Sequence, residues 1–176
     1  MRKLLILAAP FAVLASPVAA QTATGTVDIN GTVAGRCLFT LPNQTISLGE
    51  LALAGSGSTA GKLDASKVNG QTRTLVGWCN NTAATMTVTT TQLTNPASAA
   101  SGFDNRIDYT ATAVANAASA SDTSLTAGAG TASTVGMFTG NVVVTLSAAS
   151  SPTNGLLVAG AYTGNVVVTL TPTVAP

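Results

Sequence analysis

The chain has 176 residues, of which only 7% are charged, with seven basic and six acidic residues and no histidine. Charge this sparse excludes a basic face for nucleic acid and a polybasic patch for anionic lipid. Without histidine the chain cannot build a Ser-His-Asp or Cys-His catalytic arrangement. We expect no enzymatic activity and no cofactor, because a surface rich in Thr, Ser, Ala, Asn and Gly suits closely packed assembly instead.

The first twenty residues have the features of a secretory signal. "MRKLLILAAPFAVLASPVAA" has a basic start, an apolar centre and small residues before an expected cut after Ala20. Pro10 and Pro17 interrupt the apolar run, and no later apolar span approaches the roughly 20 residues that a membrane helix needs. We therefore predict a signal peptide at 1–20, export from the cytoplasm and no membrane insertion.

Residues 21–37, "QTATGTVDINGTVAGRC", alternate small or apolar residues with polar ones. A period of two indicates a half-buried β-strand, but strands usually run about five or six residues. We predict two strands in tandem, separated at Gly31, where glycine frees the backbone. The first is an N-terminal extension at 21–30, and the second, Val33 to Cys37, begins the domain's own first strand. The residues of the extension that share one face are Ala23, Gly25, Val27 and Ile29.

The remaining chain, 31–176, is predicted to form a single domain. Helix signals are weak, because the Ala-rich stretch at 113–130 is interleaved with residues that favour turns. Loops are expected at 54–62 and 115–134. Strands are expected at 36–41, 44–51, 72–79, 84–93, 105–114, 138–147 and 162–171. Several short strands with polar turns predict an all-β sandwich.

Two cysteines, Cys37 and Cys79, are present. In an exported protein an isolated pair most simply forms one disulfide, which would stabilise the fold by about 4 kcal/mol on the chain-entropy model. Two thiols without histidine do not suit zinc, and we expect no metal site. Trp78 beside Cys79 fits either a sugar-stacking platform or core packing against the disulfide, and we favour packing.

The six carboxylates are scattered, at Asp28, Glu50, Asp64, Asp104, Asp108 and Asp122. Asp104 and Asp108 are close enough in sequence to face one another in a paired-acid or calcium site. A calcium site needs six to eight oxygens, however, so we interpret both as solvated residues of turns and strand faces. The glycine-rich "GAGTASTVG" lacks the Lys-Ser/Thr of a phosphate loop.

Two near-copies close the chain, "FTGNVVVTLS" at 138–147 and "YTGNVVVTLT" at 162–171. A solenoid needs at least three copies, so these are interpreted as two strands. "NVVVTL" is β-prone, uncharged and free of proline, which makes it prone to aggregation if a sheet edge is left open. If 162–171 is an edge strand, an N-terminal strand of matched alternation is a good candidate to cover it.

The two ends and the cysteine frame resemble subunits of chaperone–usher pili. "TGTVDINGTVAGRC" before the first cysteine and "GAYTGNVVVTLTP" near the C-terminus are similar to the archaic branch, whose domain is also known as spore-coat-protein-U-like. The family commonly has Asp where this chain has Gly164, and here "TVAP" follows the closing strand. The residues that fit the family's closing pattern are Gly160, Tyr162, Val166, Val168, Thr169 and Leu170.

The resemblance implies an incomplete immunoglobulin-like, pilin-type antiparallel sandwich. The closing strand, with Tyr162, Val166, Val168 and Leu170, would border a groove that accepts a donor strand. A periplasmic chaperone would fill the groove until, at an outer-membrane usher, the extension of an identical or related subunit replaces it. The resemblance thus implies a surface pilus that supports adhesion or biofilm formation. The alternative is a secreted or surface-attached sandwich adhesin that binds a glycan or a surface without polymerising.

Overall fold

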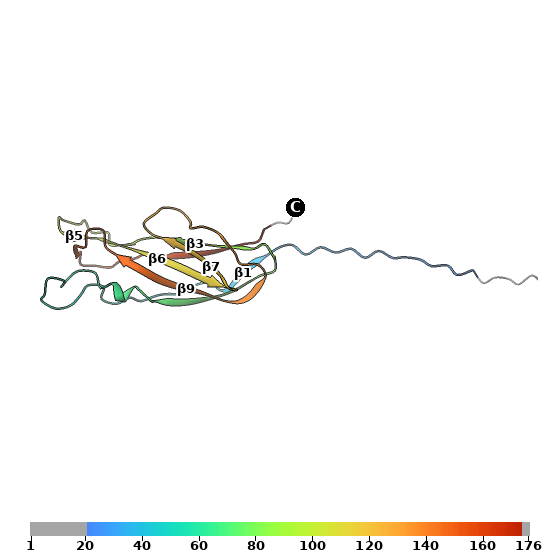
Figure 1. Cartoon of the computed structure of the whole chain (residues 1–176), viewed down its shortest axis with the longest axis horizontal. Helices are drawn as coiled ribbons and strands as arrows, with labels where there is room; N and C mark the ends of the chain where they lie inside the picture. The colour runs from blue at the N-terminus through green and yellow to red at the C-terminus, as the bar shows by residue number, and fades with distance from the viewer. Residues whose placement is uncertain (1–20, 174–176) are drawn as a thin grey trace, which may run out of the picture. The chain divides into compact units, whose positions relative to one another are not determined.

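The computed structural model describes residues 21–173, which fold into β-strands with one short 3-10 turn (Figure 1). The chain divides into two units, residues 1–32 and residues 33–176. The described part of the first unit, 21–32, is exposed at every position and carries no secondary structure. The predicted signal peptide at 1–20 lies outside the described residues.

The larger sheet of the second unit is antiparallel throughout, with strand order β1-β2-β9-β6-β4 and β7 added beside β6. Its longest strands, β6 and β9, lie side by side (Figure 1). The bounds are β1 Cys37–Leu41, β2 Thr72–Cys79, β4 Leu93–Thr94, β6 Arg106–Ala115, β7 Ala118–Thr123 and β9 Phe138–Ser150.

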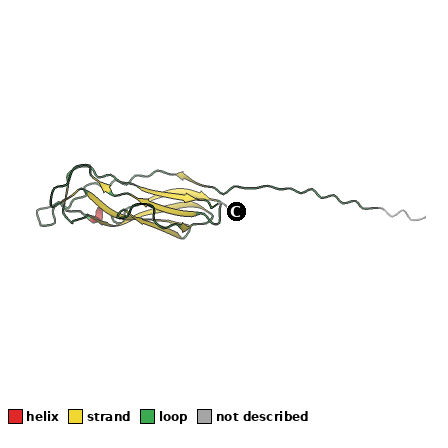
Figure 2. Cartoon of the chain, turned by 90° about the horizontal axis from the view of Figure 1, so that it is seen from above, coloured by secondary structure: helices red, strands yellow, loops and turns green. Residues whose placement is uncertain are grey.

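A second antiparallel sheet has the order β11-β3-β8. A short parallel pair, β5 with β10, and the turn η1 lie in the connections between the longer strands, which Figure 2 shows in green. The bounds are β3 Thr85–Thr90, β5 Phe103–Asp104, β8 Ser133–Thr134, β10 Leu156–Leu157, β11 Val166–Thr171 and η1 Ala65–Lys67. Between residues 21 and 173, no helix has the length and apolar character required to cross a bilayer.

Both sheets contribute to one core. In β3, Met86 and Val88 are buried while Thr87 between them is only half-buried, as a period of two requires. In β9 the same alternation buries Val142 and Val144. The predicted all-β, sandwich-like fold is therefore confirmed. The largest fully buried apolar side chains are Met86, Ile107, Val68, Val88 and Val142.

Most predicted strands are found near their expected positions. The strand at 72–79 is confirmed at both ends as β2, and the strand expected at 84–93 is divided into β3 and β4. The closing strand is shorter than predicted, because β11 begins at Val166 rather than Tyr162.

The strand expected at 44–51 is absent from the ladders of the described residues. β1 is irregular between Phe39 and Leu41, and Pro42 then lacks the N–H needed to continue pairing. The alternation of apolar and polar residues nevertheless predicted burial correctly, because Ile46 and Leu48 are half-buried against the core. The segment leaves the sheet while keeping its apolar side chains inward.

The loop expected at 115–134 is also wrong, because it contains β7 and β8. β7 follows a two-residue turn in which Asn116 and Ala117 have positive φ angles of 45° and 63°. A two-residue turn with positive φ at both positions has a backbone twist that matches the twist of the paired strands, and asparagine tolerates this conformation. Asn116 also donates through Nδ2 to the Val135 carbonyl at 2.8 Å. Tertiary contacts therefore impose a hairpin on an Ala/Ser-rich stretch.

Candidate functional site

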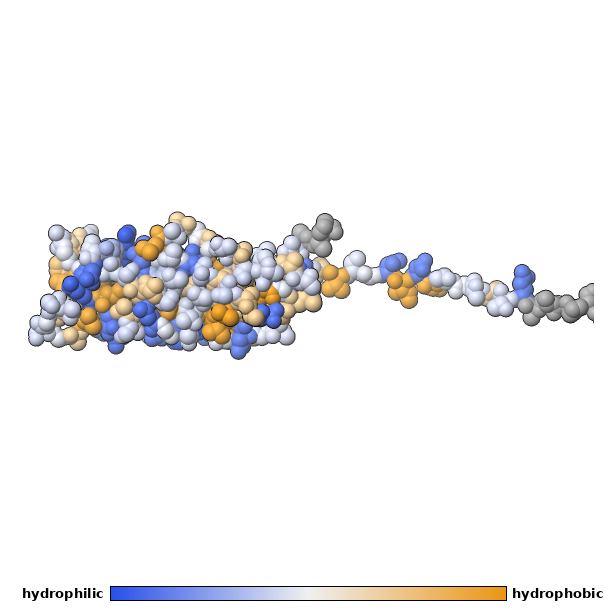
Figure 3. Space-filling model, viewed as in Figure 1, coloured by the Kyte–Doolittle hydropathy of each residue, from blue (hydrophilic) through white to orange (hydrophobic). Residues whose placement is uncertain are grey.

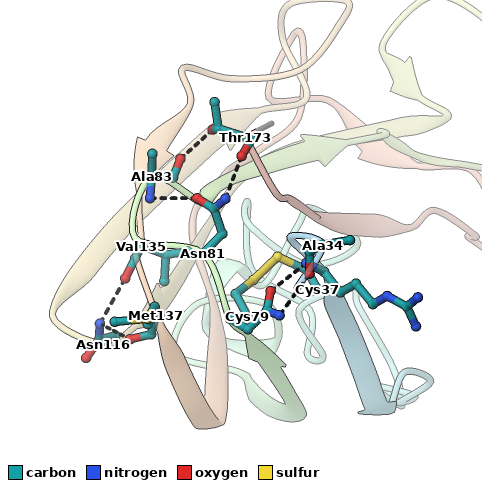
Figure 4. Close-up of a disulfide and its surroundings, with 11 residues drawn as sticks. Ala34, Cys37, Cys79, Asn81, Ala83, Asn116, Val135, Met137 and Thr173 are labelled. Carbon is teal, nitrogen blue, oxygen red and sulfur yellow. Dashed lines mark hydrogen bonds between the residues drawn. A yellow bond between two sulfur atoms is a disulfide. The ribbon is translucent and has the colours of Figure 1, made fainter. Parts of the chain in front are cut away.

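The predicted disulfide between Cys37 and Cys79 is confirmed (Figure 4). The two residues face each other in the β1–β2 register, with Cα atoms 4.2 Å apart. Just outside this pair, the Asn80 side chain accepts from the Arg36 N–H at 2.6 Å and donates to the Ala34 carbonyl at 3.0 Å. The Asn80 N–H also donates to the Arg36 carbonyl at 3.0 Å, so one covalent bond and three hydrogen bonds fix the start of β1 to the end of β2.

The residues after β11 are tied to the neighbouring turn. Asn81 donates through Nδ2 to the Thr173 carbonyl at 2.5 Å, and the Thr173 hydroxyl donates to the Ala83 carbonyl at 2.5 Å (Figure 4). Asn81 lies two residues beyond Cys79. The start of β1 and the end of β11 are therefore held at the same end of the domain.

Both of these strands are sheet edges. Among the described residues β1 pairs only with β2, and β11 pairs only with β3. β1 is at the end of the larger sheet and β11 is at the end of the smaller one. The two open edges therefore border the same side of the core.

The hydrogen bonds of β3 show where the free backbone groups of β11 point. Thr90 donates its N–H to the Asp122 carboxylate at 2.6 Å, and the Val88 carbonyl accepts from a loop N–H, so both residues turn away from β11. Their opposite numbers are Val166 and Val168. The pairs Thr90–Val166 and Val88–Val168 are therefore the non-hydrogen-bonded pairs of the ladder. In such pairs the backbone groups point away from the partner strand, so the N–H and C=O of Val166 and Val168 point toward the open edge.

A groove lies along the open edge of β11. It consists of two adjoining pockets of about 530 and 640 Å³. The residues common to both are Ile46, Leu48, Leu93 and Gly164. The side chains that make the first pocket apolar include Phe39, Leu75, Val144, Leu146, Val166 and Val168. The groove is thus bordered by the segment after β1 on one side and by β11 on the other.

Polar side chains also line the first pocket, and two of them donate hydrogen bonds to nearby carbonyls. Arg73 is half-buried there and donates to the carbonyls of Thr45 at 2.6 Å and Thr72 at 2.7 Å. The Tyr109 hydroxyl donates to the Asn165 carbonyl at 3.2 Å, and burial raises the pKa of Tyr109 to about 12. Because Tyr109 is neutral across the physiological range, Arg73 is the charged side chain of this pocket.

The closing residues predicted from sequence occupy this region. Val166 and Val168 line the first pocket, and Tyr162 lines the second. The Tyr162 hydroxyl lies 3.0 Å from the carbonyl of Val158, and burial raises the pKa of Tyr162. Leu170 has the same inward parity and packs against the core.

The residues predicted as a donor extension are all exposed. The exposed fraction is 85% for Val27 and 92% for Ile29, and Ala23 and Gly25 are exposed as well. Figure 3 shows apolar side chains in orange among the polar ones of this segment. The expectation that Val33 begins the domain's own strand is wrong, because β1 begins only at Cys37. The role of 21–30 as a donor stays a prediction.

Asp104 and Asp108 do not share a site, and the interpretation of both as solvated residues is wrong, because both are buried. The Asp104 carboxylate accepts from the backbone N–H of Gly155 at 2.8 Å and from the Thr153 hydroxyl at 2.9 Å. Burial alone would raise the pKa of Asp104, but these hydrogen bonds hold it below its usual value. Asp108 accepts instead from Gln92 at 2.8 Å. Within residues 21–173, no three His, Cys, Asp or Glu side chains are grouped to hold a metal.

The favoured interpretation of Trp78 as core packing is wrong. In β2 the side toward the core is taken by Gly77, which faces the Phe39 ring, and by Cys79. Trp78 lies on the opposite face of the strand, half-buried beside Leu38. The alternation of the strand, rather than proximity to the disulfide, decides which way the indole points.

Sequence analysis missed Arg73 and Tyr109. A signal for Arg73 was present, because it shares its parity with Leu75 and Cys79 and therefore points inward.

Comparisons with models of known protein families, with curated proteins and with solved structures found no match. An apolar groove beside unpaired backbone groups is suited to accept an extended peptide as an added strand.

Proposed function

We propose that this protein is a structural subunit of a bacterial surface pilus assembled by donor-strand exchange. The observation that carries the proposal is the groove between β1 and β11, where two sheet edges are open over one apolar core. Such a groove is what an immunoglobulin-like sandwich exposes when its last strand is missing. An inserted strand would complete the sandwich and remove both edges at once.

The occupant we propose is the segment 21–30 of a second copy of the chain. Ten extended residues span about 33 Å, and one face of the segment carries Ala23, Gly25, Val27 and Ile29 after the polar Gln21. The outward N–H and C=O groups of Val166 and Val168 would pair with the backbone of the segment. Burial of each large apolar side chain would contribute roughly 1.5–3 kcal/mol.

This arrangement accounts for the partners implied by the resemblance. An uncovered β11, with its "NVVVTL" sequence, is an aggregation hazard before assembly. A periplasmic chaperone would cover the groove, and an outer-membrane usher would be the place where the next subunit displaces it. The assembled fibre would lie at the cell surface and support adhesion or biofilm formation. The disulfide fits passage through an oxidising compartment.

The test compares variants on the two faces of the segment, produced as full chains in the native host. We expect Ile29→Lys to abolish the ladder of multimers on unheated SDS gels, because a charge would enter an apolar groove. Thr26→Lys, on the opposite face, should leave the ladder unchanged. A ladder that survives Ile29→Lys would refute the proposal.

The groove has its own matched pair. Val168 points inward, whereas Thr169, the next residue of β11, is exposed and lines neither pocket. Val168→Lys should prevent a subunit from accepting a donor, whereas Thr169→Lys should assemble normally. A wild-type chain that remains monomeric at the cell surface and binds a glycan would instead establish the non-polymerising adhesin.

A further inference from the structure

The chain contains three Asn-Gly pairs, Asn30–Gly31, Asn69–Gly70 and Asn154–Gly155. In such a pair the backbone nitrogen of glycine can attack the asparagine side-chain carbonyl, because glycine has no side chain to obstruct the approach. All three asparagines are exposed. Solvent exposure therefore does not distinguish the reactivity of the three pairs. What distinguishes them is whether the attacking glycine nitrogen is held in a hydrogen bond.

In the pair at Asn69, both the attacking N–H and the side-chain amide are held by hydrogen bonds. The Gly70 N–H donates to the Leu146 carbonyl at 2.8 Å, and Asn69 Oδ1 accepts from the Ala149 N–H at 2.9 Å. Attack would require the Gly70 N–H to break its hydrogen bond to Leu146, and the Ala149 hydrogen bond restrains the Asn69 side chain against turning toward that nitrogen. The reaction at this pair is slowed by the free energy of that local opening.

The pair at Asn154 is blocked electrostatically. The Gly155 N–H donates to the Asp104 carboxylate at 2.8 Å. The attacking species is the deprotonated backbone nitrogen, and a carboxylate in contact with that nitrogen opposes a second negative charge there. Asn154 is also fixed in the left-handed region, with φ at 55°.

The pair at Asn30 lacks these restraints. Among the residues described, neither Asn30 nor Gly31 takes part in a hydrogen bond. A Cβ placed on Gly31 would have no heavy atom within 4 Å. Both reacting groups are therefore free to approach each other.

We propose that Asn30–Gly31 is a site of spontaneous deamidation. Hydroxide removes the Gly31 amide proton and becomes water, and the nitrogen attacks Asn30 Cγ. As the Cγ–Nδ2 bond breaks, Nδ2 takes a proton from water and leaves as ammonia, which regenerates hydroxide. Water then adds to one carbonyl of the resulting succinimide ring and opens it to aspartate or isoaspartate. Either product adds one negative charge, and isoaspartate lengthens the backbone by one atom.

The consequence for assembly rests on the proposed function. Asn30 directly follows Ile29, the last apolar residue of the donor segment. An inserted donor strand would hold Asn30 in extended geometry, which keeps its Cγ away from the Gly31 nitrogen. Deamidation is then confined to subunits whose extension is free, and a subunit that waits too long acquires a charge at the end of its donor strand.

Peptide mapping by mass spectrometry tests the site. The purified full chain is held at mildly alkaline pH, and loss of ammonia is followed at the three asparagines. We expect Asn30 to react at least about tenfold faster than Asn69 or Asn154, the factor that each 1.4 kcal/mol of local opening imposes. In urea the three rates should converge, because the native restraints are lost. Similar rates in the folded protein, or faster reaction at Asn69 or Asn154, would overturn the proposal.

Two further measurements complete the test. Gly31→Ala should slow the reaction at Asn30 several-fold without a steric clash, and unchanged kinetics would contradict the mechanism. SDS-resistant multimers should be protected at Asn30 relative to monomers. If monomers deamidate at Asn30 and multimers do so equally fast, the modification site stands, and its suppression by strand insertion is refuted.

Discussion

Truncation of Ile29 offers a quantitative test of strand insertion. Ile29 is 92% exposed in the isolated chain, so nearly all of its side chain is available for burial in a neighbouring groove. Ile29→Ala removes three carbons at about 0.8 kcal/mol each, or about 2.4 kcal/mol in all. Because each 1.4 kcal/mol is a factor of ten, the subunit junction should weaken by about 50-fold.

The assay is the dissociation of preformed multimers in denaturant, followed on unheated gels. Thr26→Ala is the matched control, since its side chain lies on the opposite face of the segment, and it should stay within about 0.5 kcal/mol of wild type. Val27→Ala removes two carbons and should cost about 1.6 kcal/mol. Equal effects at Thr26 and Ile29, or none at Ile29, would refute the assignment of the inward face.

Three further predictions concern the domain itself. Cys37→Ser should lower the free energy of unfolding by about 4 kcal/mol in urea titrations, because the bond to Cys79 closes a separation of 42 residues. Ala117→Gly should stabilise the protein by about 0.5–1 kcal/mol, since φ at 63° is unfavourable for alanine. In acid, Asp104→Asn should lose less stability than wild type. The lowered pKa of Asp104 contributes stability above about pH 4 that disappears as the pH falls through the folded-state value.

Each of these predictions has an outcome that contradicts it. Equal urea midpoints for Cys37→Ser and wild type would mean that the disulfide does not contribute to the free energy of unfolding. Ala118→Gly, in the adjoining strand, is the control for the turn and should destabilise; a stabilising effect there would show that the gain is not conformational. Parallel acid unfolding curves for Asp104→Asn and wild type would mean that the carboxylate is not held charged.

Alternation along the sequence was a reliable guide to burial and a poorer guide to pairing. β2 was predicted from its apolar run and from the turn residues Asn80 and Asn81 that follow it directly. Ile46 and Leu48 alternate with polar residues and are half-buried, yet their segment forms no ladder in the described chain. Pairing depends on a backbone partner elsewhere in the fold, which local sequence does not report.

The errors at β7 and Trp78 have related causes. Ala, Ser and Asp are poor strand formers, but the buried carboxylate of Asp122 receives the Thr90 N–H and so makes β7 part of the fold. Trp78 was assigned to the core by analogy, although its parity already placed it opposite Cys79. The groove residues Val166 and Val168 were named from the closing pattern of the sequence resemblance, whereas the place of Tyr109 in the groove required the tertiary structure.

The position of the disulfide has a mechanical consequence. Cys37 is the first residue of β1, so a pull on the preceding chain reaches the cross-link before it reaches any hydrogen bond within β1. Tension then passes covalently into β2, which pairs with β9 along its whole length and with β1 from Val76 to Cys79. The edge strand is thereby spared from being peeled off, one hydrogen bond at a time. Under reducing conditions the same pull would unzip β1, and the force that the domain withstands should fall.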